Sequence, residues 1–325
     1  MRTSQSRIAR RNFLAGSAAA TTILIGSSAR AAERIRIGLP TKTYWPTIVA
    51  EAASTAKLYE KEGLAAELTM YRGGAETFEA MAAGAADLIL DPPSLVATGR
   101  KRGVASKLVA GGSTANLGWF LVVSAKSKIQ SVSDLQSKKV GITSAGSGSD
   151  ILAVWTMADR KVQFTKVPLG GGGLVPNLLS GNVDAVVLYS PLSFQLMKSG
   201  EARSLIDYTK EVPPNLTSGW IAPDRLIASN PQLVQKGLNA IYGGLGWLRA
   251  NRDAAVKLIA ETNEIPAEIA ALEYEGTTLQ LTPDGRMDRA EIQRSLELAQ
   301  LSGPTDMAPV DDIFTMSFKP VPTKA

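Results

Sequence analysis

Two similar segments, 97 positions apart, constrain the fold more than any other feature of this sequence. Each reads as a strand, a glycine turn, a short helix, a Gly-x-x-Asp unit and a second strand. The first contains Gly73, Gly74, Gly84 and Asp87, and the second contains Gly170, Gly171, Gly181 and Asp184. Glycine ends a helix in the left-handed conformation, and aspartate turns the chain into the next strand. The repeat predicts two similarly built α/β lobes, each a mostly parallel sheet flanked by helices; the alternative is chance similarity between common turns.

Two apolar, extended stretches are candidates for the connections between these lobes. Residues 118–123 follow a Gly-Gly-Ser-Thr break, and residues 217–222 follow a Pro-Pro break. If both are crossover strands, the first lobe is discontinuous. The lobes then comprise 33–118 plus 220–325 and 119–219. The tail from Asn230 has apolar residues at three- and four-residue spacing, which predicts helices that pack on the first lobe.

The first 32 residues have the pattern of an export signal. Arg7, Arg10 and Arg11 precede an apolar run over 18–25 and a small-residue Ala-Arg-Ala site. The apolar run is shorter than the roughly 20 residues of a membrane span. The segment Arg-Arg-Asn-Phe-Leu is also similar to the twin-arginine export motif, so export by that route and by the general secretory route both stay open. We therefore expect a periplasmic protein with no stable membrane anchor.

The composition disfavours several classes of function. The chain has no histidine and no cysteine, and no G-x-S-x-G motif occurs, which argues against common nucleophilic triads and against thiolate or imidazole metal sites. The five arginines of the leader account for the excess of basic over acidic residues, since 35 minus 5 leaves 30 against 30. The mature chain is thus near neutral and gives no support for nucleic-acid binding. We expect a binding protein that uses no cofactor and no metal.

A loop rich in glycine and serine, 144–149, comes between a short apolar strand and a helix expected to open at Asp150. It lacks the Gly-Lys-Ser/Thr end of a phosphate-binding P-loop and the third glycine of a dinucleotide fingerprint. Its backbone N–H groups and hydroxyls at a helix N-terminus favour an anionic or strongly polar ligand group. The alternative is an ordinary turn with Ser149 or Asp150 as N-cap, and Asp150 places a competing negative charge there.

Aromatic and charged residues at predicted strand ends complete the candidate site. Aromatic rings there suit an organic body, although they could instead pack between the lobes. Arg72 is the preferred cation for an anionic head, because it precedes a glycine pair and arginine grips such groups with two hydrogen bonds; Lys42 and Lys166 are alternatives, and each of the three could be a surface charge. Asp91 could instead receive an amine or ring N–H. The predicted ligand-binding residues are Tyr44, Trp45, Arg72, Gly73, Gly74, Asp91, Pro92, Trp119, Ser144, Gly146, Ser147, Gly148, Ser149, Gly171, Tyr189 and Trp220.

Several segments resemble the periplasmic substrate-binding proteins of ABC importers, in the branch that takes nitrate, taurine, aliphatic sulfonates and thiamine-precursor pyrimidines. The most specific segment is KIQSVSDLQSKKVG, residues 128–141, which is similar to that group's I-x-S-x-x-D-L-x-G-K-x-V-G pattern with Ser137 in place of a glycine. Further matches are AEAASTAKLYEKEGLAAEL, the two Gly-x-x-Asp units and NPQLVQKGLNAIYGGLGWLRAN. The resemblance implies a type 2 periplasmic binding fold with two lobes, two crossover strands and a ligand cleft that closes on binding.

The resemblance also implies a function. We expect a monomeric receptor that binds a small organic molecule, with a sulfonate or carboxylate head, and delivers it to an ABC permease in transient contact. The alternative within the fold is a receptor for a flat heterocycle such as a thiamine-precursor pyrimidine. A pyrimidine synthase resembles these receptors as well, but that enzyme uses histidine and a cysteine-rich motif, which this chain lacks.

Overall fold

The computed structural model describes residues 32–302 and 306–324. The export signal expected over residues 1–32 therefore lies, apart from its last residue, outside the described part of the chain. In that described part, no helix is long and apolar enough to cross a membrane.

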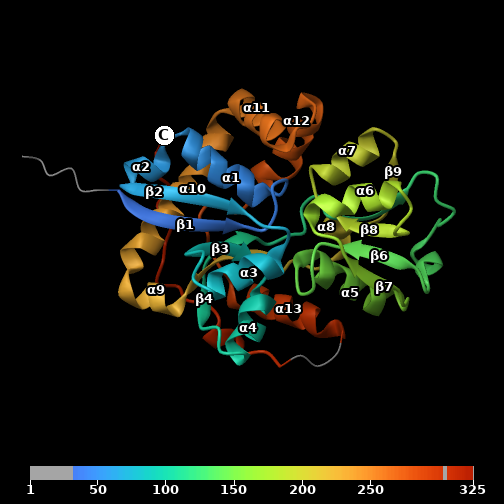
Figure 1. Cartoon of the computed structure of the whole chain (residues 1–325), viewed down its shortest axis with the longest axis horizontal. Helices are drawn as coiled ribbons and strands as arrows, with labels where there is room; N and C mark the ends of the chain where they lie inside the picture. The colour runs from blue at the N-terminus through green and yellow to red at the C-terminus, as the bar shows by residue number, and fades with distance from the viewer. Residues whose placement is uncertain (1–31, 303–305, 325) are drawn as a thin grey trace, which may run out of the picture. The chain divides into compact units, whose positions relative to one another are not determined.

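The chain forms two five-stranded sheets (Figure 1). The first sheet has the strand order β2-β1-β3-β10-β4, and the second has the order β7-β6-β8-β5-β9. The first sheet consists of β1 (Glu33–Leu39), β2 (Leu64–Met70), β3 (Leu88–Asp91), β4 (Ser106–Ser113) and β10 (Ser218–Pro223). The second consists of β5 (Phe120–Ser124), β6 (Lys139–Ile142), β7 (Thr165–Pro168), β8 (Ala185–Leu188) and β9 (Ala202–Asp207).

One strand in each sheet runs against its neighbours. β10 pairs antiparallel with β3 and β4, and β5 pairs antiparallel with β8 and β9, whereas β1 and β6 pair parallel with both of their neighbours. These two strands are the ones that the apolar stretches 118–123 and 217–222 predicted as crossovers. The architecture is that of a two-lobed type 2 periplasmic binding protein; the exact lobe boundaries at 118/119 and 219/220 remain a prediction.

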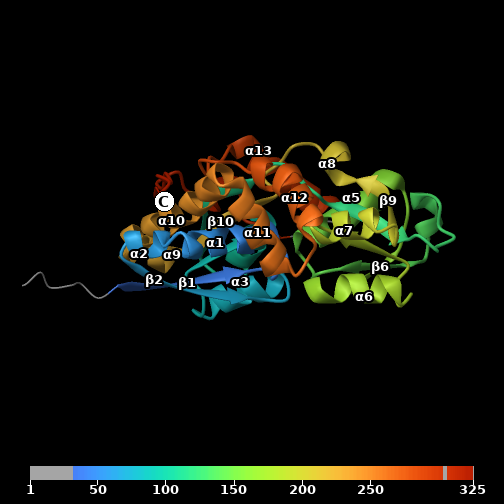
Figure 2. The same ribbon diagram turned by 90° about the horizontal axis from the view of Figure 1, so that it is seen from above.

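Helices cover both faces of the first sheet. On one face lie α1 (Trp45–Thr55) and the long α10 (Pro231–Ala250), and on the other lies α3 (Gly74–Ala82) (Figure 2). The remaining helices of this part are α2 (Leu58–Lys61), α4 (Pro93–Lys101), α9 (Asp224–Ser229), α11 (Arg252–Asn263), α12 (Ala267–Gly276) and α13 (Arg289–Ala299). Two separate clusters of buried apolar side chains result, one on each face.

The second sheet is flanked by α5 (Gly148–Arg160), α6 (Leu174–Leu179), α7 (Leu192–Lys198) and α8 (Tyr208–Glu211). Short 3-10 helices occur at Val132–Leu135, Gly171–Gly173, Thr278–Gln280, Gln300–Ser302 and Val310–Asp312. A third apolar cluster forms the core of this lobe and includes Leu121, Val187 and Trp155.

The two repeated segments have the same local structure. Gly84 and Gly181 end their helices with φ of +79° and +76°. Asp87 then accepts a hydrogen bond from the backbone N–H of Arg36 in the adjacent strand, and Asp184 accepts one from Lys139, each over 2.9 Å. The repeat is thus built into the fold, because each aspartate ties the start of its strand to a parallel neighbour.

The tail helices contact both lobes. α10 packs on α1 as expected for the first lobe, but α12 also contacts α7 and α13 also contacts α5. The tail helices thus pack more widely than the first-lobe packing that the sequence predicted, because α12 and α13 also contact helices beside the second sheet. Apolar periodicity identifies the buried stripe of a helix but does not identify the element that covers it.

Candidate functional site

A cavity lies where the carboxyl ends of strands from the two sheets meet. Its free volume is about 50 Å³. Its lining residues are Pro40, Thr41, Tyr44, Gly73, Gly74, Leu90, Asp91, Pro92, Trp119, Thr143, Ser147, Gly148, Tyr189, Thr217 and Ser218. Open α/β sheets bind ligands at this edge, since the loops that follow parallel strands converge there.

Nine of the sixteen residues predicted from sequence line this cavity, namely Tyr44, Gly73, Gly74, Asp91, Pro92, Trp119, Ser147, Gly148 and Tyr189. Sequence reasoning missed Pro40, Thr41, Leu90, Thr143, Thr217 and Ser218. Thr41 and Thr143 follow β1 and β6 closely in the chain, so a polar residue just after a predicted parallel strand was the signal that could have found them.

Three aromatic rings form one wall of the cavity. The ring centroid of Tyr44 lies 5.6 Å from that of Trp119 and 5.2 Å from that of Tyr189, and the last two centroids are 5.2 Å apart. Tyr44 comes from the turn before α1, whereas Tyr189 follows β8 in the second sheet. Burial raises the pKa of Tyr44 to about 12, so its phenol is neutral at physiological pH. The wall is therefore an uncharged aromatic surface contributed by both lobes.

Asp91 is the one carboxylic acid that lines the cavity among the described residues. It ends β3 with 2% of its surface exposed, and burial raises its pKa well above the ordinary value. Its Oδ2 atom has no hydrogen-bond partner in the described chain, and neither has the hydroxyl of Ser218 in the same cavity. A Cβ on Gly74 would lie 2.1 Å from Oδ1 of Asp91, so only glycine leaves room for the carboxyl group there.

No lysine or arginine is among the described residues that line the cavity. Arg72 is exposed, and its backbone carbonyl accepts a hydrogen bond from the N–H of Gly171 over 2.9 Å. Lys42 pairs with Glu264 over 2.5 Å, and Lys166 pairs with Asp150 over 2.6 Å. The cation expected for an anionic head is thus not supplied at this cavity by any of the three candidates.

The glycine–serine loop is held mainly by its own side chains. Ser147 caps α5 by accepting a hydrogen bond from the N–H of Asp150. The helix therefore begins at Gly148 and not at Asp150 as expected, and the N-cap at Ser149 or Asp150 in the alternative interpretation is wrong as well. The hydroxyls of Thr143, Ser147 and Ser149 lie 2.9–3.0 Å from one another. The Asp150 carboxylate accepts from the N–H of Gly146 over 2.8 Å. These bonds, made inside the loop, explain why only Ser147 and Gly148 of this loop line the cavity.

Three other predicted residues of this loop contact other parts of the structure. Ser144 accepts a hydrogen bond from the N–H of Ala75 over 3.3 Å and so joins the loop to the start of α3. Gly146 lines a separate cavity with Ser94 and Leu95, and Ser149 is fully buried. None of these three loop residues reaches the cavity between the sheets.

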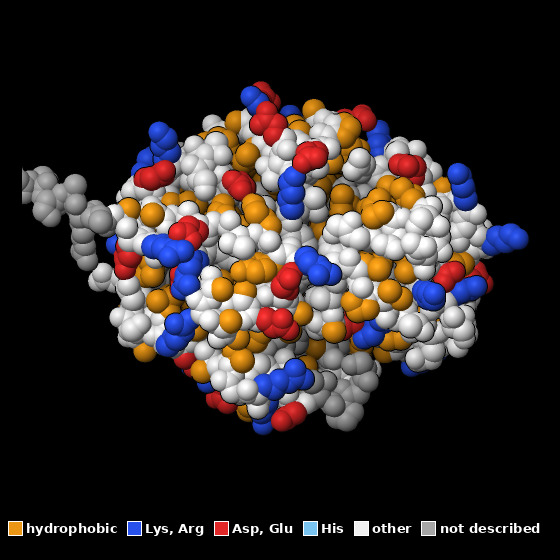
Figure 3. Space-filling view, in the orientation of Figure 1, with side chains coloured by type: hydrophobic (Ala, Val, Ile, Leu, Met, Phe, Trp, Pro, Cys, Tyr) orange, Lys and Arg blue, Asp and Glu red, His pale blue; other side chains and the backbone are white. Residues whose placement is uncertain are grey.

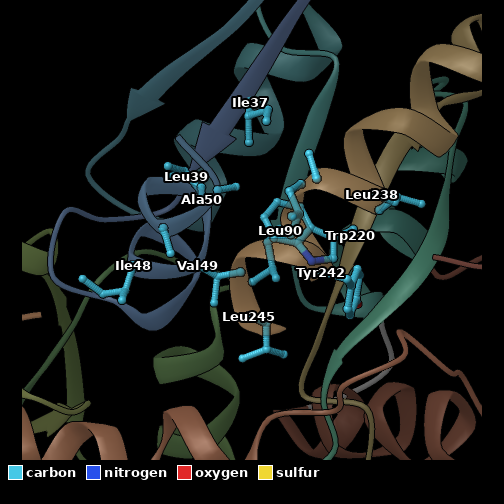
Figure 4. Packing of buried hydrophobic residues seen from close by; sticks show 14 of the residues in the cluster. Ile37, Leu39, Ile48, Val49, Ala50, Leu90, Trp220, Leu238, Tyr242 and Leu245 are labelled. Carbon is cyan, nitrogen blue, oxygen red and sulfur yellow. The ribbon is translucent and has the colours of Figure 1, made fainter. Parts of the chain in front are cut away.

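Two of the predicted tryptophans belong to the core of the first lobe. Trp45 and Trp220 are 5% and 1% exposed and line a small internal cavity beside Tyr242. Trp220 packs among Leu90, Leu238 and other apolar side chains (Figure 4). Both rings lie outside the candidate site, because Trp45 begins α1 with its side chain in the core and Trp220 lies within β10, a strand buried along its whole length.

Polar contacts join the two lobes around the cavity. The Tyr189 phenol donates to Thr41 Oγ1 over 3.1 Å. A Cβ on Gly171 would lie 2.6 Å from both Thr41 Cγ2 and the Tyr189 hydroxyl, so this glycine permits that contact, although it does not itself line the cavity. These groups form a contact between the two lobes.

A second contact between the lobes is made by residues that do not line the cavity. The hydroxyl of Ser190 is 2.8 Å from that of Thr277, which donates to Glu273 over 3.0 Å. Burial raises the pKa of Glu273 to about 8, and its hydrogen bonds with Ser190 and Thr277 oppose that rise only in part.

The described residues include no group of three or more histidine, cysteine, aspartate or glutamate side chains that could hold a metal ion. On the face of the molecule in Figure 3, acidic and basic side chains are interspersed, without a continuous basic patch. The chemistry available at the cavity is therefore one carboxyl group, hydroxyls, backbone donors and aromatic rings.

Comparison with known proteins places this geometry in a family. A Brucella abortus protein that carries the provisional name of a binding protein is 28% identical over 261 residues, which is 78% of each chain. The alkanesulfonate-binding protein SsuA of Xanthomonas axonopodis, bound to MOPS, superposes with a TM-score of 0.74 at 19% identity, covering 88% of this chain and 100% of that one. The periplasmic aliphatic sulphonate binding protein SsuA of Escherichia coli gives 0.67 at 20% identity over 90% and 94%.

An enzyme shares the fold at lower similarity. The desulfurization enzyme DSZB superposes with a TM-score of 0.56 at 17% identity, covering 84% of this chain and 94% of that one. These structural likenesses establish the fold alone. The family model described as NMT1/THI5 like matches residues 47–255, more than half of the sequence, and the chain therefore belongs to the NMT1/THI5-like family.

Proposed function

We propose that this protein is a periplasmic receptor that binds a small organic molecule between its two lobes and delivers it, unchanged, to an ABC permease. The observation that carries the proposal is the cavity at the carboxyl ends of both sheets, with Tyr44 and Asp91 contributed from one lobe and Tyr189 from the other. Family membership and the binding proteins among the structural neighbours support it.

Binding requires the lobes to move. A free volume of about 50 Å³ is room for a few water molecules and is small for an organic ligand, so we infer that the lobes separate when the ligand enters. Contacts such as Tyr189 to Thr41 re-form on closure, and the ligand then shifts an equilibrium between open and closed forms. Small-angle scattering with and without ligand measures this shift directly.

The alternative to a receptor is an enzyme, since the desulfurization enzyme DSZB shares the fold. The titratable side chains that line this cavity are Asp91, Tyr44 and Tyr189, and burial keeps all three neutral more readily than charged. Incubation of purified protein with a bound ligand, followed by mass analysis of the recovered molecule, separates the classes. Recovery of the unchanged molecule supports the receptor, and a converted product contradicts it.

Two ligand classes use different parts of the cavity. A sulfonate or carboxylate head would accept hydrogen bonds from the first N–H groups of α5 at Gly148, which have no partner within the helix. A flat heterocycle such as a thiamine-precursor pyrimidine would contact the rings of Tyr44 and Trp119. A thermal-shift panel of sulfonates, carboxylates and pyrimidines distinguishes them, because only a ligand of the folded protein raises its melting temperature.

A further inference from the structure

We propose that Asp91 determines specificity and that the ligand presents a nitrogen with N–H donors, as a protonated amine, an amidine or an amino-substituted heterocycle does, rather than an anionic head. The inference rests on the proposed receptor function and names its ligand class. It starts from Asp91 and Ser218, two cavity-lining residues that each have a buried side-chain oxygen without a hydrogen-bond partner in the described chain.

The electrostatic surroundings of Asp91 favour a donor. A buried carboxyl group is costly unless it is paired or hydrogen-bonded. No cationic side chain lines the cavity in the described ranges, and Asp91 lies against Gly74 at the first turn of α3 with its Oδ2 accepting no hydrogen bond. Two N–H groups of a ligand would satisfy the carboxylate, and the charge-assisted pair would be strong at this buried position. An anionic head could bind there only while Asp91 stays protonated, because a carboxylate at this position would repel it.

The aromatic wall supports the same ligand class. Tyr44, Trp119 and Tyr189 have mutual centroid distances of 5.2–5.6 Å, and a cation or an electron-poor heterocycle over such faces is attracted by the ring quadrupoles. Asp91 belongs to the first sheet and Tyr189 follows a strand of the second. A ligand that contacts both therefore gains its full set of interactions only in the closed form, which couples recognition to closure.

The N-terminus of α5 is the feature of the cavity that most favours an anion. The partial positive charge of this helix end is offset in part by a carboxylate of the helix itself. Asp150 lies in the first turn of this helix, where its carboxylate accepts from Gly146 and pairs with Lys166. The Ser147 hydroxyl is engaged with Thr143 and with the carbonyl of Ser144. The helix end thus offers backbone donors, and the nearby Lys166 cation is already paired with Asp150.

Calorimetric titration of the mature protein, stripped of bound ligand by unfolding and refolding, tests the proposal. The probes are benzamidine and 4-aminopyrimidine, with benzoate and benzenesulfonate as anions of matched size. We expect the nitrogen probes to bind at least tenfold more tightly than the anions. Asp91→Asn should lower the affinity of the protein for the nitrogen probes by about 10- to 100-fold, as expected for loss of a charge-assisted hydrogen bond.

A matched control is Glu51→Gln, which removes a partly buried carboxylate with a raised pKa from α1, away from the cavity. It should leave the affinity for all four probes unchanged. The comparison of nitrogen probes with anions in the unmodified protein decides the question even where Asp91→Asn fails to fold.

Tighter binding of benzoate or benzenesulfonate than of the nitrogen probes overturns the inference. Unchanged affinity of Asp91→Asn for the nitrogen probes overturns it as well. Neither result contradicts the receptor function. Failure of all four probes also overturns the inference as stated. The receptor function fails with it only when a whole-cell extract of small molecules gives no thermal shift either.

Discussion

The phenol of Tyr189 donates a hydrogen bond to the hydroxyl of Thr41 over 3.1 Å, and this bond joins the residue after β8 in one sheet to the loop after β1 in the other. The same phenol lies 3.1 Å from the Thr43 hydroxyl. Tyr189 thus has two roles in one position, since its ring lines the cavity and its hydroxyl links the lobes.

The Tyr189→Phe variant retains the aromatic ring that lines the cavity and loses the hydrogen bond to Thr41 that joins the lobes. We expect ligand affinity to fall about 2- to 10-fold, the usual net contribution of one hydrogen bond, and the ligand-free protein to be more open by small-angle scattering. The control is Tyr208→Phe, which removes a 2.7 Å hydrogen bond to Thr156 inside the second lobe. An equal loss of affinity in both variants would show that general destabilisation, and not closure, is responsible.

Gly171→Ala tests the close approach of the lobes. The new methyl group would lie 2.6 Å from Thr41 and from the Tyr189 hydroxyl, so the closed form should be disfavoured and affinity should fall more than tenfold. Gly172→Ala is the matched control, because a Cβ at that position has no neighbour within 4 Å. Titration of both variants with the same ligand gives the comparison, and equal affinities would contradict a role for this contact in closure.

Asp91→Asn should stabilise the ligand-free protein near neutral pH. Burial raises the pKa of Asp91 in the folded state, so the folded protein retains a proton that the unfolded chain releases. Stability from this group is complete below the unfolded pKa near 4 and declines as pH rises towards the folded pKa. The variant should gain free energy of unfolding at pH 7, by up to about 1.4 kcal/mol for each pH unit above the unfolded pKa, because an asparagine needs no proton to stay neutral; at pH 4 it should gain little. Denaturant unfolding at both pH values measures the gain, and an equal gain at the two would refute the explanation.

Glu273 should make stability pH-dependent over a defined window. Its pKa is raised from 4.5 to about 8 by burial, so the folded state holds its proton while the unfolded state loses it between these values. Stability due to Glu273 is therefore lost as pH rises from about 4.5 to about 8, and Glu273→Gln should flatten the profile. Glu268→Gln, at an exposed position in the same helix, should leave the profile unchanged. Parallel curves for wild type and Glu273→Gln would count against the assignment.

The sequence predicted the fold well because the fold depends on local signals that recur. Gly84 and Gly181 mark helix ends by positive φ, and the aspartates that follow, Asp87 and Asp184, make equivalent hydrogen bonds. These features need no knowledge of tertiary contacts, so the two lobes and both crossover strands could be read from the chain.

The site was predicted less well because side-chain direction depends on tertiary packing. Tyr44 and Trp45 are adjacent in the chain, yet only Tyr44 lines the cavity while Trp45 packs in the core. The strand β10 is buried along its whole length, so its pattern does not reveal which face Trp220 occupies. Arg72 was a reasonable partner for an anion by position, but it is exposed at the rim of the contact between lobes.

Native mass spectrometry of protein purified under gentle conditions shows directly whether a small molecule is held between the lobes. We expect a one-to-one adduct with a small molecule that carries a basic or amino nitrogen, is released unchanged on unfolding, and is lost from the Gly171→Ala variant but not from Gly172→Ala. Protein that carries no adduct and takes none up from a periplasmic extract, or that releases a chemically altered product, would contradict it.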